Sequence, residues 1–237
     1  LFGKLYNGAI IRVVNLVSNK PMNNPSLIVF DWDQTLWNSW DLHLQGMWHA
    51  ADTLGLPRPS ADIIAPGYSM PFVEHVTSLF QDETETVLDI YMKFYVARMT
   101  DLGHLYEGIA EALTSLKRQG YSLAVFSDKR TAYGEPEAEY SGLVTLFDTV
   151  LFREEGRPYK PDPQGLHQVL GKLGVGVRDA LVVGDSHVDV ECARNAGVAS
   201  AAALWGSVNR QATLEQQPDY VWNTVGDMES ALNRSPS

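Results

Sequence analysis

The 237-residue sequence has few cysteines, few positive charges and no long hydrophobic run. Its one cysteine, Cys192, cannot form a disulfide within the chain, so the composition permits a reducing compartment and we expect a cytoplasmic protein. Lys and Arg number 18 against 29 Asp and Glu, which gives a formal net charge of −11. Because binding a nucleic-acid backbone requires a basic face, we expect no nucleic-acid partner. No apolar stretch is long enough to cross a bilayer, so no membrane partner is expected either.

The first 21 residues do not follow the pattern of the rest. Residues 1–21 start without a methionine, and Met22 resembles a start. The segment Ala9–Val14 is apolar, but it is short, Arg12 interrupts it, and no A-x-A-like cleavage site follows, so it is a poor signal peptide. We interpret residues 1–21 as an N-terminal extension outside the fold, with an added edge strand as the alternative.

The most informative segment places two carboxylates after a buried strand. The apolar run Leu27–Phe30 predicts a strand covered on both faces, and it is followed by Asp31 and Asp33. In an open α/β sheet the ligand crevice lies at the carboxyl ends of such strands. The turn allows the two aspartates to converge while Trp32 points away. Two converging anions need a cation, and hard carboxylate oxygens with no His or Cys nearby predict Mg²⁺ as the cofactor.

Three further motifs complete a recognisable series. They are Ser127 after Leu123–Phe126, Lys160 within Tyr159–Pro163, and Asp185 with Asp189 after Ala180–Gly184. Together with Asp-x-Asp-x-Thr at residues 31–35, they resemble in order the four motifs of the haloacid dehalogenase (HAD) superfamily. The overall layout is most similar to the phosphoglycolate phosphatase-like branch, which has a small helical cap.

The resemblance implies a role for each catalytic residue. Asp31 would be the nucleophile that forms an aspartyl-phosphate, and Asp33 the general acid and base. Ser127 would donate a hydrogen bond to the phosphoryl oxygens, and Lys160 would neutralise charge on the aspartate and the phosphoryl group. Asp128 stands where many relatives have asparagine, so we expect it to alter substrate or phosphate contacts.

The same resemblance implies the metal ligands. Asp31, the backbone carbonyl of Asp33, and Asp185 would hold Mg²⁺, with Asp189 either a further ligand or a partner of the ligands. These oxygen donors suit a hard cation. Asp189 also lies in the first turn of an expected helix, where the helix dipole alone favours an acid.

Between Ser39 and Leu105 the pattern changes from strand runs to helical periodicity. Apolar stripes at helical spacing occur over residues 40–54, 72–80 and 87–99. Gly55 followed by Pro57 ends the first of these helices. An all-helical insertion at this place resembles the cap of the HAD superfamily, which closes over the site and selects the substrate. We therefore expect a small-molecule substrate.

After the insertion, strand and helix patterns alternate. Strands are predicted over residues 121–126, 149–152, 180–183 and 198–204, and helices over 108–119, 136–144, 164–173 and 188–196. Such alternation predicts a parallel sheet with right-handed crossovers. The predicted fold is α/β, a three-layer α/β/α Rossmann-like sandwich. Its catalytic core comprises residues 22–38 and 106–237, and its α-helical cap residues 39–105.

The predicted function is a Mg²⁺-dependent phosphatase, a hydrolase of phosphoric monoester bonds that acts on a small phosphorylated metabolite. Two alternatives remain open at this point. One is a phosphomutase of the β-phosphoglucomutase kind, which would share the covalent intermediate. The other is a non-catalytic HAD-like scaffold, although such a scaffold has no chemical need for Asp31, Asp33, Lys160 and Asp185 together. We expect a monomer or a homodimer.

Overall fold

A parallel sheet forms the centre of the protein. The computed structural model describes residues 24–233, so the predicted N-terminal extension at 1–21 lies outside the described residues. All neighbouring strands of the six-stranded sheet pair in parallel. In spatial order they are β5 (Thr149–Arg153), β4 (Ser122–Arg130), β1 (Leu27–Phe30), β6 (Ala180–Gly184), β7 (Ala199–Ala203) and β8 (Tyr220–Trp222). This arrangement confirms the predicted α/β fold.

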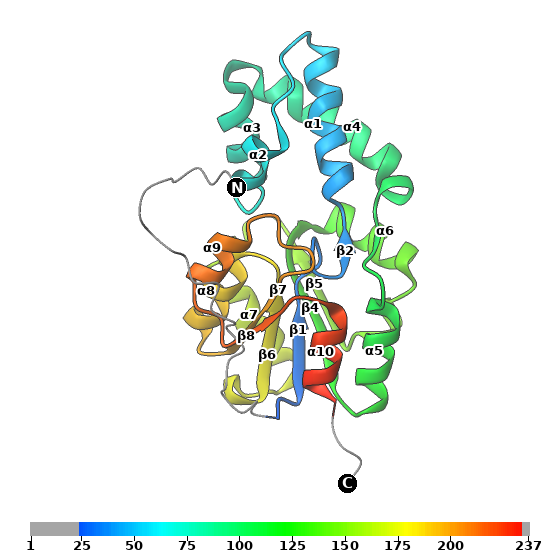
Figure 1. Cartoon of the computed structure of the whole chain (residues 1–237), viewed down its shortest axis with the longest axis vertical. Coiled ribbons are helices and arrows are strands. Elements are labelled where there is room, and N and C mark those ends of the chain that lie inside the picture. The colour runs from blue at the N-terminus through cyan, green and yellow to red at the C-terminus, as the bar shows by residue number, and fades with distance from the viewer. Residues whose placement is uncertain (1–23, 234–237) are drawn as a thin grey trace, which may run out of the picture.

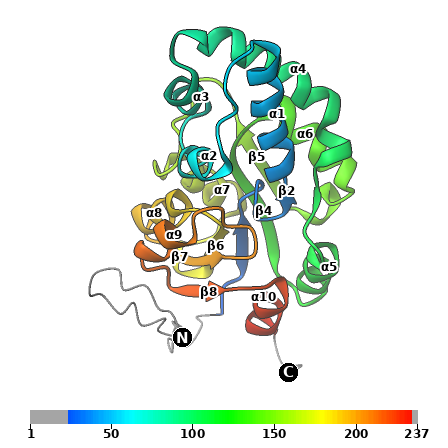
Figure 2. The ribbon, with the colours of Figure 1, turned by 45° about the horizontal axis from the view of Figure 1, so that its top comes forward.

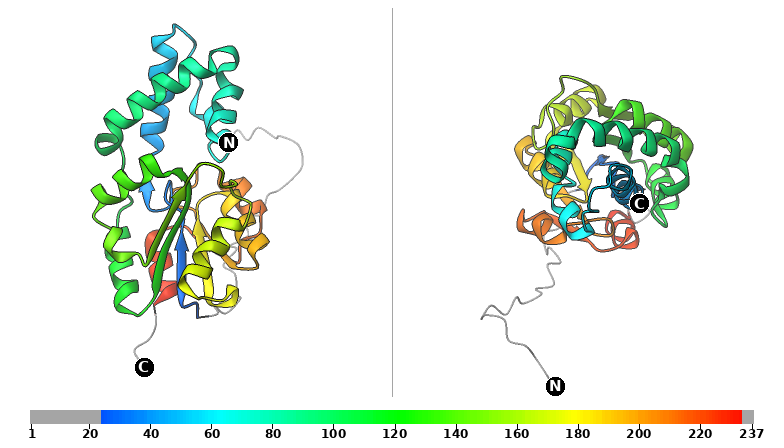
Figure 3. Two further views of the ribbon diagram at one scale, coloured as in Figure 1. Left: turned by 180° about the vertical axis from the view of Figure 1, so that it is seen from behind. Right: turned by 90° about the horizontal axis from the view of Figure 1, so that it is seen from above.

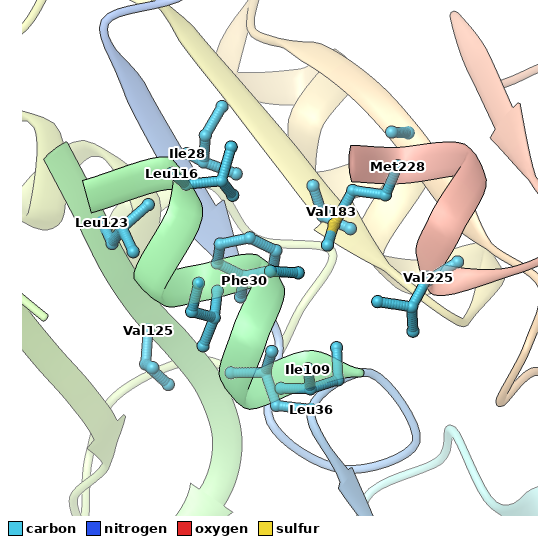
Figure 4. Packing of buried hydrophobic residues seen from close by; sticks show 14 of the residues in the cluster. Ile28, Phe30, Leu36, Ile109, Leu116, Leu123, Val125, Val183, Val225 and Met228 are labelled. Carbon is cyan, nitrogen blue, oxygen red and sulfur yellow. The ribbon is translucent and has the colours of Figure 1, made fainter. Parts of the chain in front are cut away.

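Helices cover both faces of this sheet because the strand residues alternate between the faces. Ile28 and Phe30 pack with α5 (Ile109–Arg118) and α10 (Val225–Leu232), as Figure 4 shows. Leu27 and Val29 pack on the opposite face with the helices α7 (Gln164–Leu173) and α8 (His187–Ala196). The four side chains of β1 are fully buried, so the strand that leads into Asp31 is fixed from both sides.

A helical unit, called the helical insert below, lies between β1 and β4 in sequence. It comprises α1 (Trp40–Thr53), α2 (Ala61–Ile64), the 3₁₀ turn η1 (Ala65–Gly67), α3 (Phe72–Phe80), η2 (Gln81–Glu83) and α4 (Thr84–Leu102). The insert has a hydrophobic cluster of its own, built mainly on the packing of α1 against α4. Figures 1 and 3 show it standing over the carboxyl ends of the strands.

A two-stranded antiparallel sheet closes the base of the helical insert. β2 (Trp37–Asn38) pairs with β3 (His104–Leu105), so the two segments that connect the insert to the sheet lie side by side. In Figure 2, with the top of the molecule turned forward, α1 is seen to rise from β2, and Trp37 of β2 forms a bridge with Asp33. Both connections therefore run close to Asp31 and Asp33.

Two predicted boundaries differ from the structure in a way that matters for the site. The strand predicted to end at Phe126 continues as β4 to Arg130, through an irregularity after which Arg130 pairs with Arg153 of β5. The helix predicted to start at Pro136 begins earlier, as α6 (Thr131–Ser141), with the proline inside it. Tertiary packing overrides the cost of that proline, because Glu137 and Ala138 are buried against the core.

The C-terminal part completes the sheet with elements that were not predicted. α9 (Arg210–Glu215), β8 and α10 follow β7, and short 3₁₀ turns occur at η3 (Val144–Leu146) and η4 (Val177–Asp179). A capping box formed by Thr224 and Asp227 starts α10, and this Thr-x-x-Asp signal was present in the sequence. Within residues 24–233, the structure contains no helix that combines the length and the hydropathy of a membrane span.

Candidate active site

The four motifs come together at the carboxyl edge of the sheet. Asp31 and Asp33 follow β1, Ser127 lies in the last part of β4, Lys160 lies in the loop after β5, and Asp185 follows β6, and these four strands are neighbours in the sheet. A cavity of about 490 Å³ lies between this edge and the helical insert. The predicted site residues that line it are Asp31, Asp33, Ser127, Asp128, Lys160, Asp185 and Asp189.

Asp31 and Lys160 form a buried ion pair. The Lys160 ammonium donates hydrogen bonds to Oδ1 of Asp31 and Oδ1 of Asp189, both at 2.7 Å. Burial alone would lower the pKa of Lys160, but the Asp189 and Asp31 carboxylates outweigh it and raise that pKa. Burial raises the pKa of Asp31 to about 7, and Lys160 opposes the rise. One lysine thus pairs with two carboxylates, so its single positive charge does not neutralise both of them.

Three carboxylates gather at this point, and their donor set fits a hard cation. Asp31, Asp185 and Asp189 are buried and each offers an oxygen, and these oxygens lie within 4.8 Å of one another. Burial, followed by the charges of Asp189 and Asp31, raises the pKa of Asp185 well above its ordinary value. Such mutual repulsion is what a bound divalent cation relieves. The group therefore matches the oxygen chemistry of Mg²⁺.

Asp189 accepts more side-chain hydrogen bonds than Asp31 or Asp185. Its Oδ1 accepts from Lys160, and its Oδ2 accepts from the backbone N–H of Ser186 at 3.1 Å and from the Ser186 hydroxyl. The bond from the Ser186 N–H is one half of the capping box of α8, and in the other half the Ser186 hydroxyl oxygen accepts from the Asp189 N–H. Asp185 is less engaged, with one contact from the Thr35 hydroxyl at 3.4 Å. Asp189 therefore orients Lys160 and starts a helix, while Asp185 keeps more oxygen capacity for a ligand.

The side chain of Asp33 lies apart from the three clustered carboxylates, whereas the turn geometry predicts that the side chains of Asp31 and Asp33 converge. Its Oδ1 accepts from the Lys129 ammonium at 2.8 Å and from the Ser39 hydroxyl at 2.5 Å. Its carboxylate is not one of the three that cluster. The chain turns sharply after it, since Gln34 has a φ of 57°, in the left-handed region. The two aspartates line one cavity but face different partners.

Lys129, for which the sequence motifs predict no role, is the cation that pairs with Asp33. Its ammonium also forms an ion pair with Glu137 at 2.8 Å and donates to the Tyr95 hydroxyl at 2.6 Å. Burial lowers the pKa of Lys129, but Asp33 and Glu137 together raise it above its ordinary value. Glu137 is completely buried and also accepts from the Trp32 indole at 2.9 Å and from the Tyr95 hydroxyl. Tyr95 belongs to α4, so this network joins the helical insert to the sheet.

Ser127 and Asp128 stand at the end of the apolar part of β4. The Ser127 side chain is buried, and its carbonyl accepts from the Arg157 guanidinium at 2.8 Å. Oδ2 of Asp128 accepts from the backbone N–H of Lys160 at 2.8 Å. Burial raises the pKa of Asp128, with Lys160 opposing the rise. Asp128 therefore holds the loop that carries Lys160, a positional role beside the predicted substrate contact.

The half of the cavity formed by the helical insert is mainly aromatic and apolar. His43 and His75 are buried there, and the Nε2 atoms of both rings have no partner within the described residues. Burial lowers the pKa of both rings. The other insert residues that line the cavity are Tyr68, Ser69, Met70, Phe72, Val73, Leu88, Tyr91, Met92 and Tyr95, together with Ser39 directly before α1. An organic group of appreciable size fits this half.

Comparison with known proteins agrees with the motifs. The family model described as haloacid dehalogenase-like hydrolase matches residues 28–203. Pyrophosphatase PpaX of Bacillus velezensis is 26% identical over 201 residues, which cover 85% of this chain and 93% of that protein. Pyrophosphatase PpaX of Bacillus cereus is 28% identical over 211 residues, which cover 88% of this chain and 98% of that protein.

Solved structures share the fold. A haloacid dehalogenase-like hydrolase from Streptococcus pneumoniae has a TM-score of 0.82 at 24% identity, covering 90% of this chain and 100% of its own. A predicted phosphoglycolate phosphatase from Haemophilus somnus has a TM-score of 0.81 at 25% identity, with the same coverage. The family match spans well over half of the sequence and includes Asp31, Ser127, Lys160 and Asp185. The chain therefore belongs to the haloacid dehalogenase-like hydrolases.

Proposed function

We propose that this hydrolase is a Mg²⁺-dependent phosphatase that cleaves a small phosphorylated metabolite through an aspartyl-phosphate at Asp31. The observation that carries the proposal is the buried group at the strand ends, in which Lys160 lies 2.7 Å from Asp31 beside Asp185 and Asp189. This group opens on a cavity large enough for a small ester. The resemblance of all four motifs to one family supports the same chemistry.

The residues divide the reaction between them. The Asp31 carboxylate attacks phosphorus, and the oxygen of the leaving alcohol departs as the Asp31–phosphorus bond forms. Asp33 lies on the side of the helical insert, where it donates a proton to that oxygen and later accepts one from the attacking water. Lys160 and the Ser127 hydroxyl meet the charge of the phosphoryl oxygens. Two carboxylates two residues apart thereby take different roles.

A divalent cation would be held by Asp31, Asp185 and the backbone carbonyl of Asp33, with Asp189 holding Lys160 beside it. Bound there, Mg²⁺ would supply charge neutralisation between the carboxylates and the phosphoryl oxygens. The oxygen donors and the raised pKa values of Asp31 and Asp185 support a cation at this point. In this proposal residues 39–105 act as the cap, residues 22–38 and 106–237 form the catalytic core, and the protein is cytoplasmic.

The test is phosphate release from a panel of substrates with and without Mg²⁺. The panel includes phosphoglycolate, hexose phosphates and nucleoside monophosphates, and also pyrophosphate because the PpaX relatives are named as pyrophosphatases. Release that requires Mg²⁺ and is lost in Asp31→Asn supports the proposal. A long-lived phosphoenzyme that releases phosphate only slowly would favour the phosphomutase alternative. No release and no phosphoenzyme from any member would leave the non-catalytic scaffold.

A further inference from the structure

Four cationic side chains line the cavity, and they fall into two pairs. Lys129 and Lys160 each form ion pairs with two carboxylates. Arg130 and Arg153 line the same cavity, and within residues 24–233 neither of them forms an ion pair with any carboxylate. The first pair serves the carboxylates of the site. No carboxylate among the described residues pairs with either arginine.

The backbone places the two arginines side by side. Arg130 is the last residue of β4 and Arg153 the last of β5, and the two residues are paired in the parallel register. This pairing follows the strand irregularity after Phe126, which brings the end of β4 back to β5. Adjacent like charges repel each other, so the arrangement costs free energy unless an anion lies between them.

Arg153 is held in a fixed position. Its guanidinium carbon lies 3.8 Å from the centre of the Tyr159 ring, which also lines the cavity. The side chain is half-buried, and its Nε is buried without a partner among the described residues. A stacked guanidinium loses little further entropy when it binds a planar or tetrahedral anion. Arg130 is exposed and therefore adds charge at the rim of the cavity.

The acidic groups nearby do not supply the missing charge. Glu155 lines the cavity and is exposed, but it forms no ion pair with either arginine. The chain carries a net charge of −11, so a general attraction for anions cannot account for binding at this rim. A preference for anions there would have to come from these two side chains.

We propose that Arg130 and Arg153 bind a second anionic group of the substrate while Asp31 reacts with its phosphoryl group. The substrate class is then a phosphate ester that also carries a carboxylate or a second phosphate, in preference to a neutral sugar phosphate. The inference rests on the proposed function, because it takes the Asp31 end of the cavity as the phosphoryl site. Guanidinium groups recognise both kinds of anion through paired hydrogen bonds.

The test measures binding, so that it does not depend on turnover. The probes are phosphate esters of ω-hydroxy acids of increasing chain length, each matched with its neutral carboxamide, and a parallel series of bisphosphates matched with alkyl monophosphates. Titration calorimetry with the Asp31→Asn protein and Mg²⁺ gives the affinity ratio of each matched pair. At the chain length that binds most tightly, the affinity of the anionic member of a matched pair exceeds that of the neutral member by roughly tenfold or more. Which series shows the larger ratio distinguishes a carboxylate from a second phosphate.

Substitutions assign the preference to the two arginines. In the Asp31→Asn background, Arg153→Gln reduces the ratio by roughly tenfold and Arg130→Gln by a smaller factor, because Arg130 is exposed. Arg178→Gln is the matched control, since Arg178 is an exposed arginine directly before β6, at the opposite edge of the sheet. Equal affinities within every matched pair would overturn the proposal. So would a ratio that survives both substitutions, or one that falls equally in Arg178→Gln.

Failure of this inference is distinct from failure of the proposed function. An enzyme that releases phosphate but shows no anionic preference keeps its activity and loses the assigned substrate class. A protein that releases no phosphate, yet shows a ratio that depends on Arg153, keeps the anion site and loses the proposed chemistry.

Discussion

Asp31 and Asp33 are two residues apart, yet they lie in different surroundings. Asp31 shares Lys160 with Asp189 and sits in the carboxylate group at the strand ends. Asp33 shares Lys129 with Glu137 and accepts from Ser39, at the start of the helical insert. Each aspartate has its own lysine, and each lysine has a second, more deeply buried acid.

The difference shows how one motif can supply two functions. The surroundings of Asp31 come from the core alone, with Lys160 in the loop after β5 and Asp189 in the first turn of α8. The surroundings of Asp33 include the insert, because the Tyr95 hydroxyl contacts Lys129 and the Tyr68 hydroxyl lies 3.0 Å from that of Ser39. A movement of the insert would therefore change the contacts of Asp33 before those of Asp31. Four predictions test this separation, from the largest expected effect to the smallest.

Replacing the two aspartates in turn should separate their roles. Asp31→Asn should reduce turnover by roughly 10⁴-fold or more, because no other group at the site can form the covalent bond. Asp33→Asn should reduce it by roughly 10²- to 10⁴-fold with an alkyl phosphate, the range of general acid–base catalysis. Steady-state phosphate release measures both. Asp82→Asn, at an exposed position in η2, is the control and should retain full activity. Comparable activity in Asp31→Asn and the control would remove the nucleophile assignment.

Removing the cation should affect stability as well as activity. The folded-state pKa of Asp31 is about 7 against an ordinary 3.8, so the metal-free folded state holds a proton that the unfolded state releases at lower pH. Its stability should therefore fall as the pH rises through about 7. Mg²⁺ at a hundred times its dissociation constant should restore about 2.7 kcal/mol. Calorimetry in chelator and in Mg²⁺, at about pH 5 and about pH 8, compares the two states.

Asp185→Asn sharpens the same prediction. It removes one of the repelling charges, so the metal-free protein should become more stable above pH 7 while the stabilisation by Mg²⁺ is lost. Turnover should fall by more than the roughly 10- to 100-fold typical of outer-sphere partners of a metal. A variant that keeps the full response to Mg²⁺ would contradict the assigned ligand set.

Replacing Lys129, the lysine that pairs with Asp33, should lower both the stability of the fold and the turnover. Lys129→Met leaves Glu137 buried without its cation and should destabilise the fold by about 3–5 kcal/mol. The double variant Lys129→Met/Glu137→Gln should recover much of that stability but not the turnover, because Asp33 still lacks its cation. Urea unfolding and phosphate release are measured in parallel. Lys93→Met, which breaks an exposed pair with Asp89, should cost less than about 1 kcal/mol. Turnover that recovers with stability would show that Lys129 is only structural.

The smallest effect should come from the hydroxyls that link Asp33 to the insert. Ser39→Ala removes one hydrogen bond to the Asp33 carboxylate and should reduce kcat by roughly tenfold at most. Tyr68→Phe acts one bond further away and should reduce kcat by roughly two- to threefold. Ser78→Ala loses a hydrogen bond to the His75 carbonyl within the insert and serves as the control. If the control lowers kcat as much as Ser39→Ala, the link to Asp33 has no special role.

Much of the fold could be predicted because its signals are local. The four apolar residues of β1 and the helical stripe of α7 have the bounds that their patterns indicate. The φ of +67° at Gly55, just past the end of α1, confirms the predicted stop of that helix. In each case the pattern and the tertiary packing agree, so periodicity alone identifies the element.

The ion pairs of Lys129 with Asp33 and Glu137 could not be predicted, because only the fold brings these residues together. Glu135, Glu137 and Glu139 alternate in one segment, and only the packing of α6 determines that Glu137 is the buried one. Residues 128–130 are polar, so the hydrophobic pattern does not indicate that β4 continues to Arg130 or that Arg130 pairs with Arg153. The motifs show which charged residues form the site, whereas the partners of Asp33 come together only through the tertiary fold.

The most direct test of the separation between the two aspartates is to trap the phosphoenzyme. The protein is mixed with p-nitrophenyl phosphate and Mg²⁺, quenched in acid and digested, and the peptide containing Asp31 and Asp33 is sequenced by mass spectrometry. Because this leaving group needs little protonation, Asp33→Asn should accumulate phosphate on Asp31, while Asp31→Asn should carry none. Phosphate on that peptide in Asp31→Asn, or none in Asp33→Asn while nitrophenol is released, would contradict the account.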